Sequence, residues 1–231
     1  MTKKYFVTGT DTGVGKTYIT AGILNAFRQN KFSTLGIKPV ASGGKYHNGH
    51  LVNEDALVLQ EASSIKLHYH QINPFCLEPP IAPHIAAELV QQRLTVAALK
   101  QRTQYAIEFP ADLCLIEGAG GWYTPLNAKE TLADFVKALQ LPVILVIGMR
   151  LGCINHTLLT LNALKQDGVI LAGWIANCID PEMPVLQENL AFFREYIKAP
   201  CLGIVGWGDA VVLDSLATQG IYFGLHYAEN N

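Results

Sequence analysis

Short apolar stretches rich in Val, Ile and Leu alternate with helical stretches along most of the chain. The apolar stretches predict buried strands at residues 5–8, 34–38, 113–117, 143–147, 171–177 and 201–205. We expect connecting helices at residues 16–29, 53–62, 82–92, 95–108, 132–139, 155–166 and 182–198. Because such alternation produces parallel strands joined by crossover helices, the chain is predicted to form an α/β fold. Its centre would be a doubly wound, mostly parallel sheet flanked by helices.

No internal boundary is visible in the sequence. No repeat, low-complexity tract or linker interrupts the alternation, and residues 73–83, with four prolines, are expected to form a fixed loop. A chain of 231 residues, 50% of them hydrophobic, can bury one large core. We therefore expect a single domain over residues 1–231. The tail at residues 209–231 carries no motif that assigns it a role.

Charge and hydropathy exclude several kinds of partner. The formal net charge is −2, from 17 basic and 19 acidic residues, which leaves no electrostatic footprint for nucleic acid or an anionic membrane. The longest apolar runs, such as residues 143–147, are too short to span a bilayer. The chain starts with a few polar residues and then a strand, without the features of a signal peptide, so we expect a cytoplasmic protein.

Residues 9–17, Gly-Thr-Asp-Thr-Gly-Val-Gly-Lys-Thr, lie between the first predicted strand and the first predicted helix. A loop in this position directs backbone N–H groups and the positive end of a helix dipole at an anion. Gly13 and Gly15 let the main chain approach a phosphate, Lys16 would reach the terminal phosphates, and Thr17 would hold Mg²⁺. The loop is one residue longer than the usual P-loop pattern, and Thr10 stands at the usual glycine position. The fold is thus predicted to be P-loop NTPase-like.

Other chemical groups follow the predicted strands, where ligands bind in open α/β sheets. Lys38 ends the second strand, and Ser42 lies four residues further on. Glu117 ends the third strand and precedes a glycine track, at the place where many nucleotide-hydrolysing folds keep a metal-holding acid. Asp55 begins a helix, where a negative charge also stabilises the helix dipole. Residues 152–155 form a second helix start that is suited to an anion.

Four ordered motifs together resemble the dethiobiotin synthetase family. They are Gly-Thr-Asp-Thr-x-Val-Gly-Lys-Thr at 9–17, Lys-Pro-Val-Ala-Ser-Gly at 38–43, Glu-Gly-Ala-Gly-Gly-Trp at 117–122 and Leu-Gly-Cys-Ile-Asn-His at 151–156. The resemblance runs from about residue 4 to residue 207. It implies a homodimeric enzyme of biotin biosynthesis that acts on small molecules. Such an enzyme converts 7,8-diaminopelargonate, CO₂ and MgATP into dethiobiotin, ADP and phosphate.

The resemblance also implies a role for each matching residue. Lys38 and Lys16 are the expected catalytic residues, and Ser42 is the expected substrate-binding serine. The helix start at Gly152, Cys153, Ile154 and Asn155 would bind the substrate carboxylate across the dimer interface. Mg²⁺ would be held by Thr17, Asp55 and Glu117. The expected ATP-binding residues are Thr12, Gly13, Val14, Gly15, Lys16, Thr17, Tyr18, Asp55, Glu117, Gly118, Ala119, Gly120, Asn177, Gly206 and Trp207.

The sequence departs from the family pattern at two places. Gly13 stands where well-known bacterial members have a glutamate. The family usually continues the last strand as Gly-Glu-Ile-Pro-Trp, whereas residues 203–207 read Gly-Ile-Val-Gly-Trp. The second departure concerns the side of the site that faces adenine, where Gly206 and Trp207 are the candidates.

Two other functions use a similar phosphate loop. A cobyrinate-type amide-forming ATPase normally needs a glutamine-hydrolysing domain, for which 231 residues leave no room. A nucleotide switch of the plasmid-partition type typically has a lysine near the start of the loop, where this chain has Thr10. Such a switch would also give no reason for Lys38 and Ser42.

Overall fold

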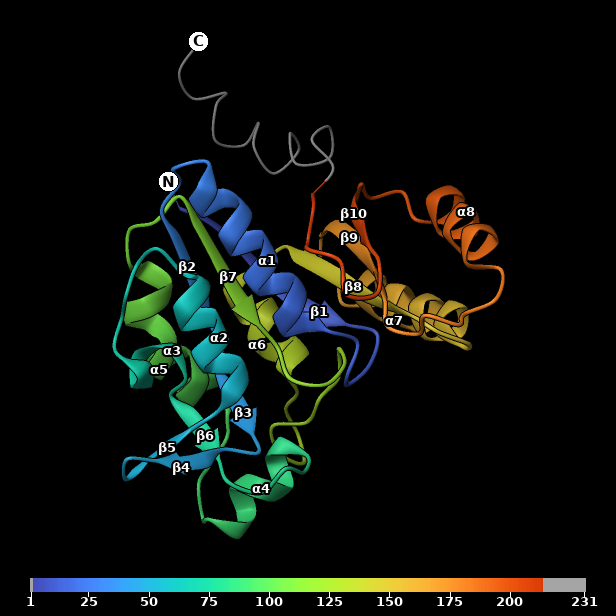
Figure 1. The fold of residues 1–231 in the computed structure, drawn as a ribbon. Helices are drawn as coiled ribbons and strands as arrows, with labels where there is room; N and C mark the ends of the chain where they lie inside the picture. Colours follow the sequence, from blue (N-terminus) through green and yellow to red (C-terminus); the bar gives the residue numbers. More distant parts are fainter. Residues whose placement is uncertain (1, 214–231) are drawn as a thin grey trace.

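The computed structural model describes residues 2–213, which form a six-stranded parallel sheet with helices on both faces (Figure 1). The strand order is β10-β9-β8-β1-β7-β2, and each neighbouring pair is parallel. The strands are β1 (Lys3–Gly9), β2 (Thr34–Ile37), β7 (Leu113–Glu117), β8 (Val143–Met149), β9 (Leu171–Cys178) and β10 (Cys201–Val205). The predicted fold class and the predicted strands are confirmed. The unassigned tail at 209–231 lies outside the described residues from 214 onward.

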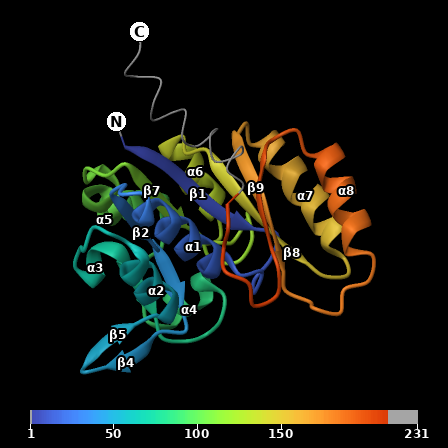
Figure 2. The ribbon, with the colours of Figure 1, turned by 45° about the horizontal axis from the view of Figure 1, so that its top comes forward.

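Two layers of helices bury the two faces of this sheet. Helices α1 (Lys16–Gln29) and α2 (Glu54–Ala62) cover one face, and α5 (Val96–Glu108), α6 (Leu132–Leu139), α7 (Cys153–Gln166) and α8 (Leu186–Tyr196) cover the other (Figures 1 and 2). Successive residues of a strand point to opposite faces of the sheet and pack against the helices on those faces. In β7, Leu115 packs under α1, while Ile116 packs against α5 and α6. Both faces being covered explains why these strands are continuous apolar runs.

Two predicted helices are shorter than expected. Helix α8 was predicted over 182–198 but begins at Leu186, because Pro184 disfavours helical backbone at the residue before it. Helix α4 (Pro83–Leu89) ends before Gln91, whose positive φ of 53° breaks helical geometry.

A small region between β2 and α4 contains structure that the sequence analysis did not predict. Strand β3 (Val40–Ser42) pairs in parallel with β6 (Phe75–Leu77), so the predicted loop at 73–83 includes a short strand. Strands β4 (Lys45–His47) and β5 (His50–Val52) form a hairpin, and α3 (Tyr69–Ile72) is a single turn of helix. This region extends the loop after β2 into a wall beside the edge of the sheet.

The order of the strands determines where a ligand can bind. β1 lies between β7 and β8, and the chain runs from β7 to β8 across it. In open α/β sheets, ligands bind beyond the carboxyl ends of the strands at such a reversal of strand order. The loops after β1, β2 and β7 therefore form the place to look for a site.

Candidate functional site

The loop after β1 depends on two glycines with left-handed backbone. Gly13 has φ of 74° and Gly15 has φ of 83°, and Gly15 is the N-cap of α1. A Cβ built on Gly15 would lie 2.2 Å from Nδ2 of Asn177, whereas a Cβ on Gly13 would have no atom within 4 Å. Asn177, at the end of β9, donates from Nδ2 to the carbonyl of Val14 at 2.9 Å. The side-chain amide of Asn177 thus supports the conformation of the loop through this hydrogen bond.

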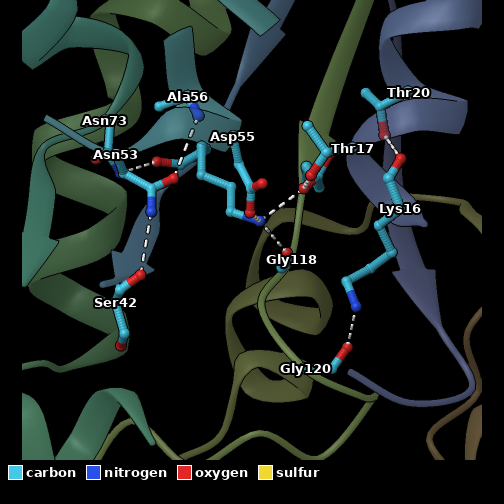
Figure 3. Close-up of polar contacts among 12 residues, drawn as sticks. Lys16, Thr17, Thr20, Ser42, Asn53, Asp55, Ala56, Asn73, Gly118 and Gly120 are labelled. Atoms are coloured by element: carbon cyan, nitrogen blue, oxygen red, sulfur yellow. Dashed lines mark hydrogen bonds and ion pairs between the residues drawn. The ribbon is translucent and has the colours of Figure 1, made fainter. Parts of the chain in front are cut away.

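Lys16 lies in this loop with its charge largely removed from water. The residue is 7% exposed, and its Nζ donates to the carbonyls of Gly120 at 2.6 Å and Asp11 at 3.0 Å (Figure 3). Burial, followed by the positive charge of Lys38, lowers the pKa of Lys16 to about 8. The ammonium is still protonated at neutral pH, but its hydrogen-bond acceptors are uncharged carbonyls. An anion in the loop would supply the missing counter-charge.

Glu117 lies at the centre of the site and is fully buried. Its Oε1 accepts hydrogen bonds from Thr17 Oγ1 and from Lys38 Nζ, both at 2.6 Å. Its Oε2 has no hydrogen-bond partner within residues 2–213. Figure 3 shows Asp55 and Thr17 converging on the same point from α2 and α1.

Lys38 joins the two acids of the site. Its Nζ lies 2.6 Å from Glu117 Oε1 and 3.2 Å from Asp55 Oδ2, and it also donates to the carbonyl of Gly118 at 3.0 Å. Burial by itself lowers the pKa of Lys38, but the charges of Glu117 and Asp55 outweigh it, so that the pKa is raised overall. Lys38 is therefore a permanent cation in the buried part of the site.

These groups line one open cavity of about 730 Å³. Of the predicted site residues, the cavity is lined by Thr12, Gly13, Gly15, Lys16, Thr17, Lys38, Ser42, Asp55, Glu117, Ala119 and Gly120. The hydroxyl of Ser42 is buried there without a partner among the described residues. The opposite wall comes from residues 80–83 and 124–125, which the sequence analysis did not single out. The phosphate loop, both lysines, the serine and the two acids thus face one another.

The residues predicted for the adenine side lie next to this cavity rather than on its wall. Trp207, after β10, is 64% exposed, and the carbonyl of Gly206 accepts from the backbone N–H of Asp209 at 3.2 Å. The hydroxyl of Tyr18 on α1 donates to the carbonyl of Asp209. The chain after β10 therefore contacts the first turn of α1, and it starts beside Asn177, the register partner of Val205.

The second predicted anion site is also outside the cavity. Gly152, with φ of 92°, is the N-cap of α7, and residues 152–155 do not line the cavity. Leu151 is 91% exposed, while Cys153 is buried. Arg150, which precedes this helix start, forms an ion pair of 2.6 Å with Asp11 of the phosphate loop. Sequence reasoning missed this link, since nothing in the motif pattern pairs the two residues.

Comparisons with known proteins agree on one family. A family model described as an AAA domain matches residues 3–213. The ATP-dependent dethiobiotin synthetase BioD of Cellvibrio japonicus is 51% identical over 203 residues, which cover 88% of this chain and 89% of that protein. The protein of the same name from Pseudomonas paraeruginosa is 50% identical, with 96% of this chain and 99% of that protein covered.

Solved structures with low sequence identity share the fold. Cobyrinic acid a,c-diamide synthase from Mycobacterium smegmatis, with bound ADP and magnesium, superposes with a TM-score of 0.55 at 15% identity, covering 100% of this chain and 97% of that one. The septum site-determining protein MinD from Pyrococcus horikoshii, complexed with Mg-ADP, gives a TM-score of 0.55 at 15% identity, covering 97% and 86%.

Replacing Gly13 and Gly15 by alanine, one at a time, should separate the cost of left-handed backbone from the cost of a collision with Asn177. Gly13→Ala should lose roughly 1–2 kcal/mol of unfolding free energy, because L residues disfavour left-handed backbone. Gly15→Ala should lose more and also weaken ADP binding, because its Cβ collides with Asn177. Denaturant unfolding and calorimetric titration with ADP measure both effects. Equal losses in the two variants would contradict the bracing role of Asn177.

Proposed function

Since the chain belongs to the family of ATP-dependent dethiobiotin synthetases, we propose that it closes the ureido ring of dethiobiotin through the cavity described above. Its substrates are 7,8-diaminopelargonate, CO₂ and ATP, and its products are dethiobiotin, ADP and phosphate. The observation that carries this proposal is the position of Lys38. Its buried ammonium contacts Glu117 and Asp55 and faces the same cavity as Lys16.

The first step joins one amine of the substrate to CO₂. The nitrogen forms a bond to carbon and loses a proton to solvent, which gives a carbamate. Ser42 is suited to orient this group, because its hydroxyl lines the cavity and has no other hydrogen-bond partner among the described residues. A buried hydroxyl without a partner favours a polar ligand.

The second step transfers the γ-phosphoryl group. A carbamate oxygen attacks phosphorus, the bond to the β-phosphate oxygen breaks, and ADP leaves with its electron pair. Negative charge gathers between the carbamate and the phosphoryl group during this step. Lys16 and Lys38 line the cavity from two sides and are placed to stabilise that charge where it develops.

The third step closes the ring. The second amine attacks the carbonyl carbon of the carbamic-phosphoric anhydride, and phosphate leaves and takes up the amine proton. Water would hydrolyse this anhydride, so the site must exclude it. The walls at residues 80–83 and 124–125 are placed to shield the reacting groups.

The site also fits Mg²⁺. Oε2 of Glu117 is a buried carboxylate oxygen without a partner in the described part of the chain, and Thr17 and Asp55 lie beside it. Hard oxygen atoms of this kind, completed by phosphate and water, are what Mg²⁺ prefers. Residues 2–213 contain no group of three or more His, Cys, Asp or Glu suited to hold a metal, so Thr17 and ATP are needed to complete the ligand set. When bound, Mg²⁺ neutralises charge on the phosphates.

Asn177, Gly206, Trp207 and Tyr18 are proposed to surround the adenine. Asn177 contacts Val14 of the phosphate loop, and Tyr18, beside that loop on α1, contacts the segment that follows Gly206 and Trp207, which supports a base placed on that side. A cytoplasmic location stays a prediction of the sequence. Among residues 2–213, none of the helices has both the length and the hydrophobicity that crossing a bilayer requires.

We further propose a homodimer in which Gly152, Cys153, Ile154 and Asn155 of one subunit bind the substrate carboxylate in the site of the other. Two features support it: the N-cap geometry of Gly152 and the fact that residues 152–155 do not line the cavity of their own subunit. Leu151, just before this helix, and Leu159, on it, are exposed by 91% and 60% and would be covered in such a dimer.

Lys38→Leu should lower kcat by about 100- to 1,000-fold while ATP binding changes little, because the charge is needed mainly as phosphoryl transfer proceeds. Lys38→Arg keeps the charge and should lose less, through its larger planar head. Removing the lysine leaves Glu117 buried without its cation, which destabilises the fold by roughly 3–5 kcal/mol, so unfolding is measured on the same samples. Near-normal turnover in Lys38→Leu would assign the cationic role to another residue.

Glu117→Gln should shift the Mg²⁺ concentration needed for half-maximal activity, because the variant removes a carboxylate beside the proposed ion. The glutamine retains the size of the side chain and can still accept from Thr17. Activity is measured against Mg²⁺ at saturating ATP, with Glu54→Gln as a control. Glu54 lies on the same helix turn as Asp55 and, within residues 2–213, pairs only with the exposed Lys45. An unchanged Mg²⁺ dependence in Glu117→Gln would remove this residue from the ligand set.

Mixing two inactive variants tests the shared site directly. Lys38→Leu removes the cation from its own site, and Asn155→Asp repels the substrate carboxylate in the site of its partner. In a symmetric dimer, a 1:1 mixture after subunit exchange should regain about a quarter of wild-type activity, because half of the dimers contain one intact site. If each subunit carried a complete site, mixing would restore nothing.

A further inference from the structure

The hydroxyl of Tyr69 lies at the junction of three elements behind the cavity. Tyr69 begins α3, and its hydroxyl accepts from the backbone N–H of Asn53 at 2.7 Å and donates to Asn73 Oδ1 at 2.8 Å. Burial raises the pKa of Tyr69, so the hydroxyl stays protonated and able to donate. Both amide side chains that flank it are buried: Asn53 is 7% exposed and Asn73 is 2% exposed.

Asn73 connects this hydroxyl to Lys38. Its Nδ2 donates to the carbonyl of Lys38 at 2.6 Å, and the backbone N–H of Lys38 donates to the carbonyl of Ile72 at 2.9 Å. The main chain of Lys38 is therefore held on both sides by the last residues of α3. The position from which the lysine side chain starts depends on how α3 is seated.

Asn53 connects the same hydroxyl to Ser42 and Asp55. Its Nδ2 donates to the carbonyl of Ser42 at 3.0 Å, and its Oδ1 accepts from the N–H of Ala56 at 3.3 Å, which caps the start of α2 (Figure 3). Asp55 lies in that first turn and contacts Lys38 Nζ at 3.2 Å. One phenol thus links the backbone positions of a lysine, a serine and an acid of the cavity.

We propose that Tyr69 is a positioning residue for formation and phosphorylation of the carbamate, which acts through Asn53 and Asn73 to set Lys38, Ser42 and Asp55 relative to one another. Tyr69 does not line the catalytic cavity within the described residues and contacts no reacting group. It lines a second cavity of about 610 Å³ on the other side of the network. This inference rests on the proposed function, because it assumes that Lys38 and Ser42 act in the cavity.

Within residues 2–213, none of the hydrogen bonds made by Tyr69, Asn53 and Asn73 reaches the phosphate loop. The ammonium of Lys16 is held by the carbonyls of Gly120 and Asp11, and Gly15 lies against Asn177. None of these three partners belongs to α2 or α3. Removing the hydroxyl of Tyr69 should therefore displace the groups proposed to act on the carbamate and leave the contacts between Lys16 and ATP intact. A residue that only stabilises the fold would not separate the two substrates in this way.

Tyr69→Phe is the first test, with Tyr105→Phe as the matched control. Tyr105 lies on α5, is 56% exposed, and keeps its ring contact with Phe109 when the hydroxyl is removed. In Tyr69→Phe we expect kcat to fall by roughly 10- to 100-fold, since small misplacements of reacting groups have effects of that size. The Kd for ATP, measured by calorimetry without Mg²⁺, should stay near that of the wild type, because Asp55 is proposed to act only through the metal. Tyr105→Phe should match the wild type in both.

Asn53→Asp is the second test and decides the matter if Tyr69→Phe does not fold. Aspartate keeps the acceptor that caps α2 and the backbone N–H bonded to Tyr69, but it removes the donor to Ser42. We expect a raised KM for the diamine with unchanged ATP binding, together with some loss of thermal stability, because the carbonyl of Ser42 loses its buried donor.

The outcomes distinguish this inference from the proposed function. A Tyr69→Phe enzyme with wild-type kcat, or one that loses ATP binding in proportion to kcat, overturns the positioning role. If Tyr69→Phe fails to fold, an unchanged diamine KM in Asn53→Asp overturns it. Lys38→Leu is assayed in parallel. If that variant remains inactive while Tyr69→Phe is normal, only the positioning inference fails; if Lys38→Leu is active, the proposed roles in the cavity fail first.

Discussion

Lys38 and Glu117 form a buried ion pair because the sheet places the ends of β2 and β7 side by side. In the parallel register, Ile37 lies opposite Ile116, so the next residue of each strand is Lys38 on one and Glu117 on the other. Either charge alone would be costly at this depth, and each makes the burial of the other possible. Thr17 then bonds to Glu117, and Asp55 to Lys38, which ties α1 and α2 to the same pair. Strand pairing thus places the two charged groups at the centre of the cavity side by side.

The two lysines of the cavity have different electrostatic surroundings. Lys38 has two carboxylates beside it, and its pKa is raised. Lys16 is surrounded by carbonyls, and burial and Lys38 lower its pKa to about 8. A phosphate would therefore gain most from Lys16, which has no carboxylate in contact with its ammonium among the described residues. This difference supports the proposal that Lys16 binds ATP and that Lys38 stabilises the charge shared with the carbamate.

The sequence predicted the features that depend on local pattern. Residues 113–117 and 201–205 are strands over the predicted range, and residues 16–29 and 132–139 are helices over the predicted range. In open α/β sheets, ligands bind at the carboxyl ends of the strands. This rule predicted one site containing Lys16, Lys38, Ser42, Asp55 and Glu117. The β4–β5 hairpin was missed although Asn48-Gly49, both with positive φ, is a turn signal. The links through Tyr69 and the Arg150–Asp11 pair had no such signal, because they join segments whose approach only tertiary packing determines.

The central claim is that the cavity transfers the γ-phosphoryl group of ATP to a carbamate oxygen. Oxygen labelling tests it directly. The enzyme is mixed rapidly with diamine, ATP and C¹⁸O₂, before the label exchanges with water, and the released phosphate is analysed by mass spectrometry. The account predicts that one labelled oxygen passes from the carbamate into each phosphate formed along with dethiobiotin. Phosphate that carries only solvent oxygen and the oxygens of ATP would contradict it.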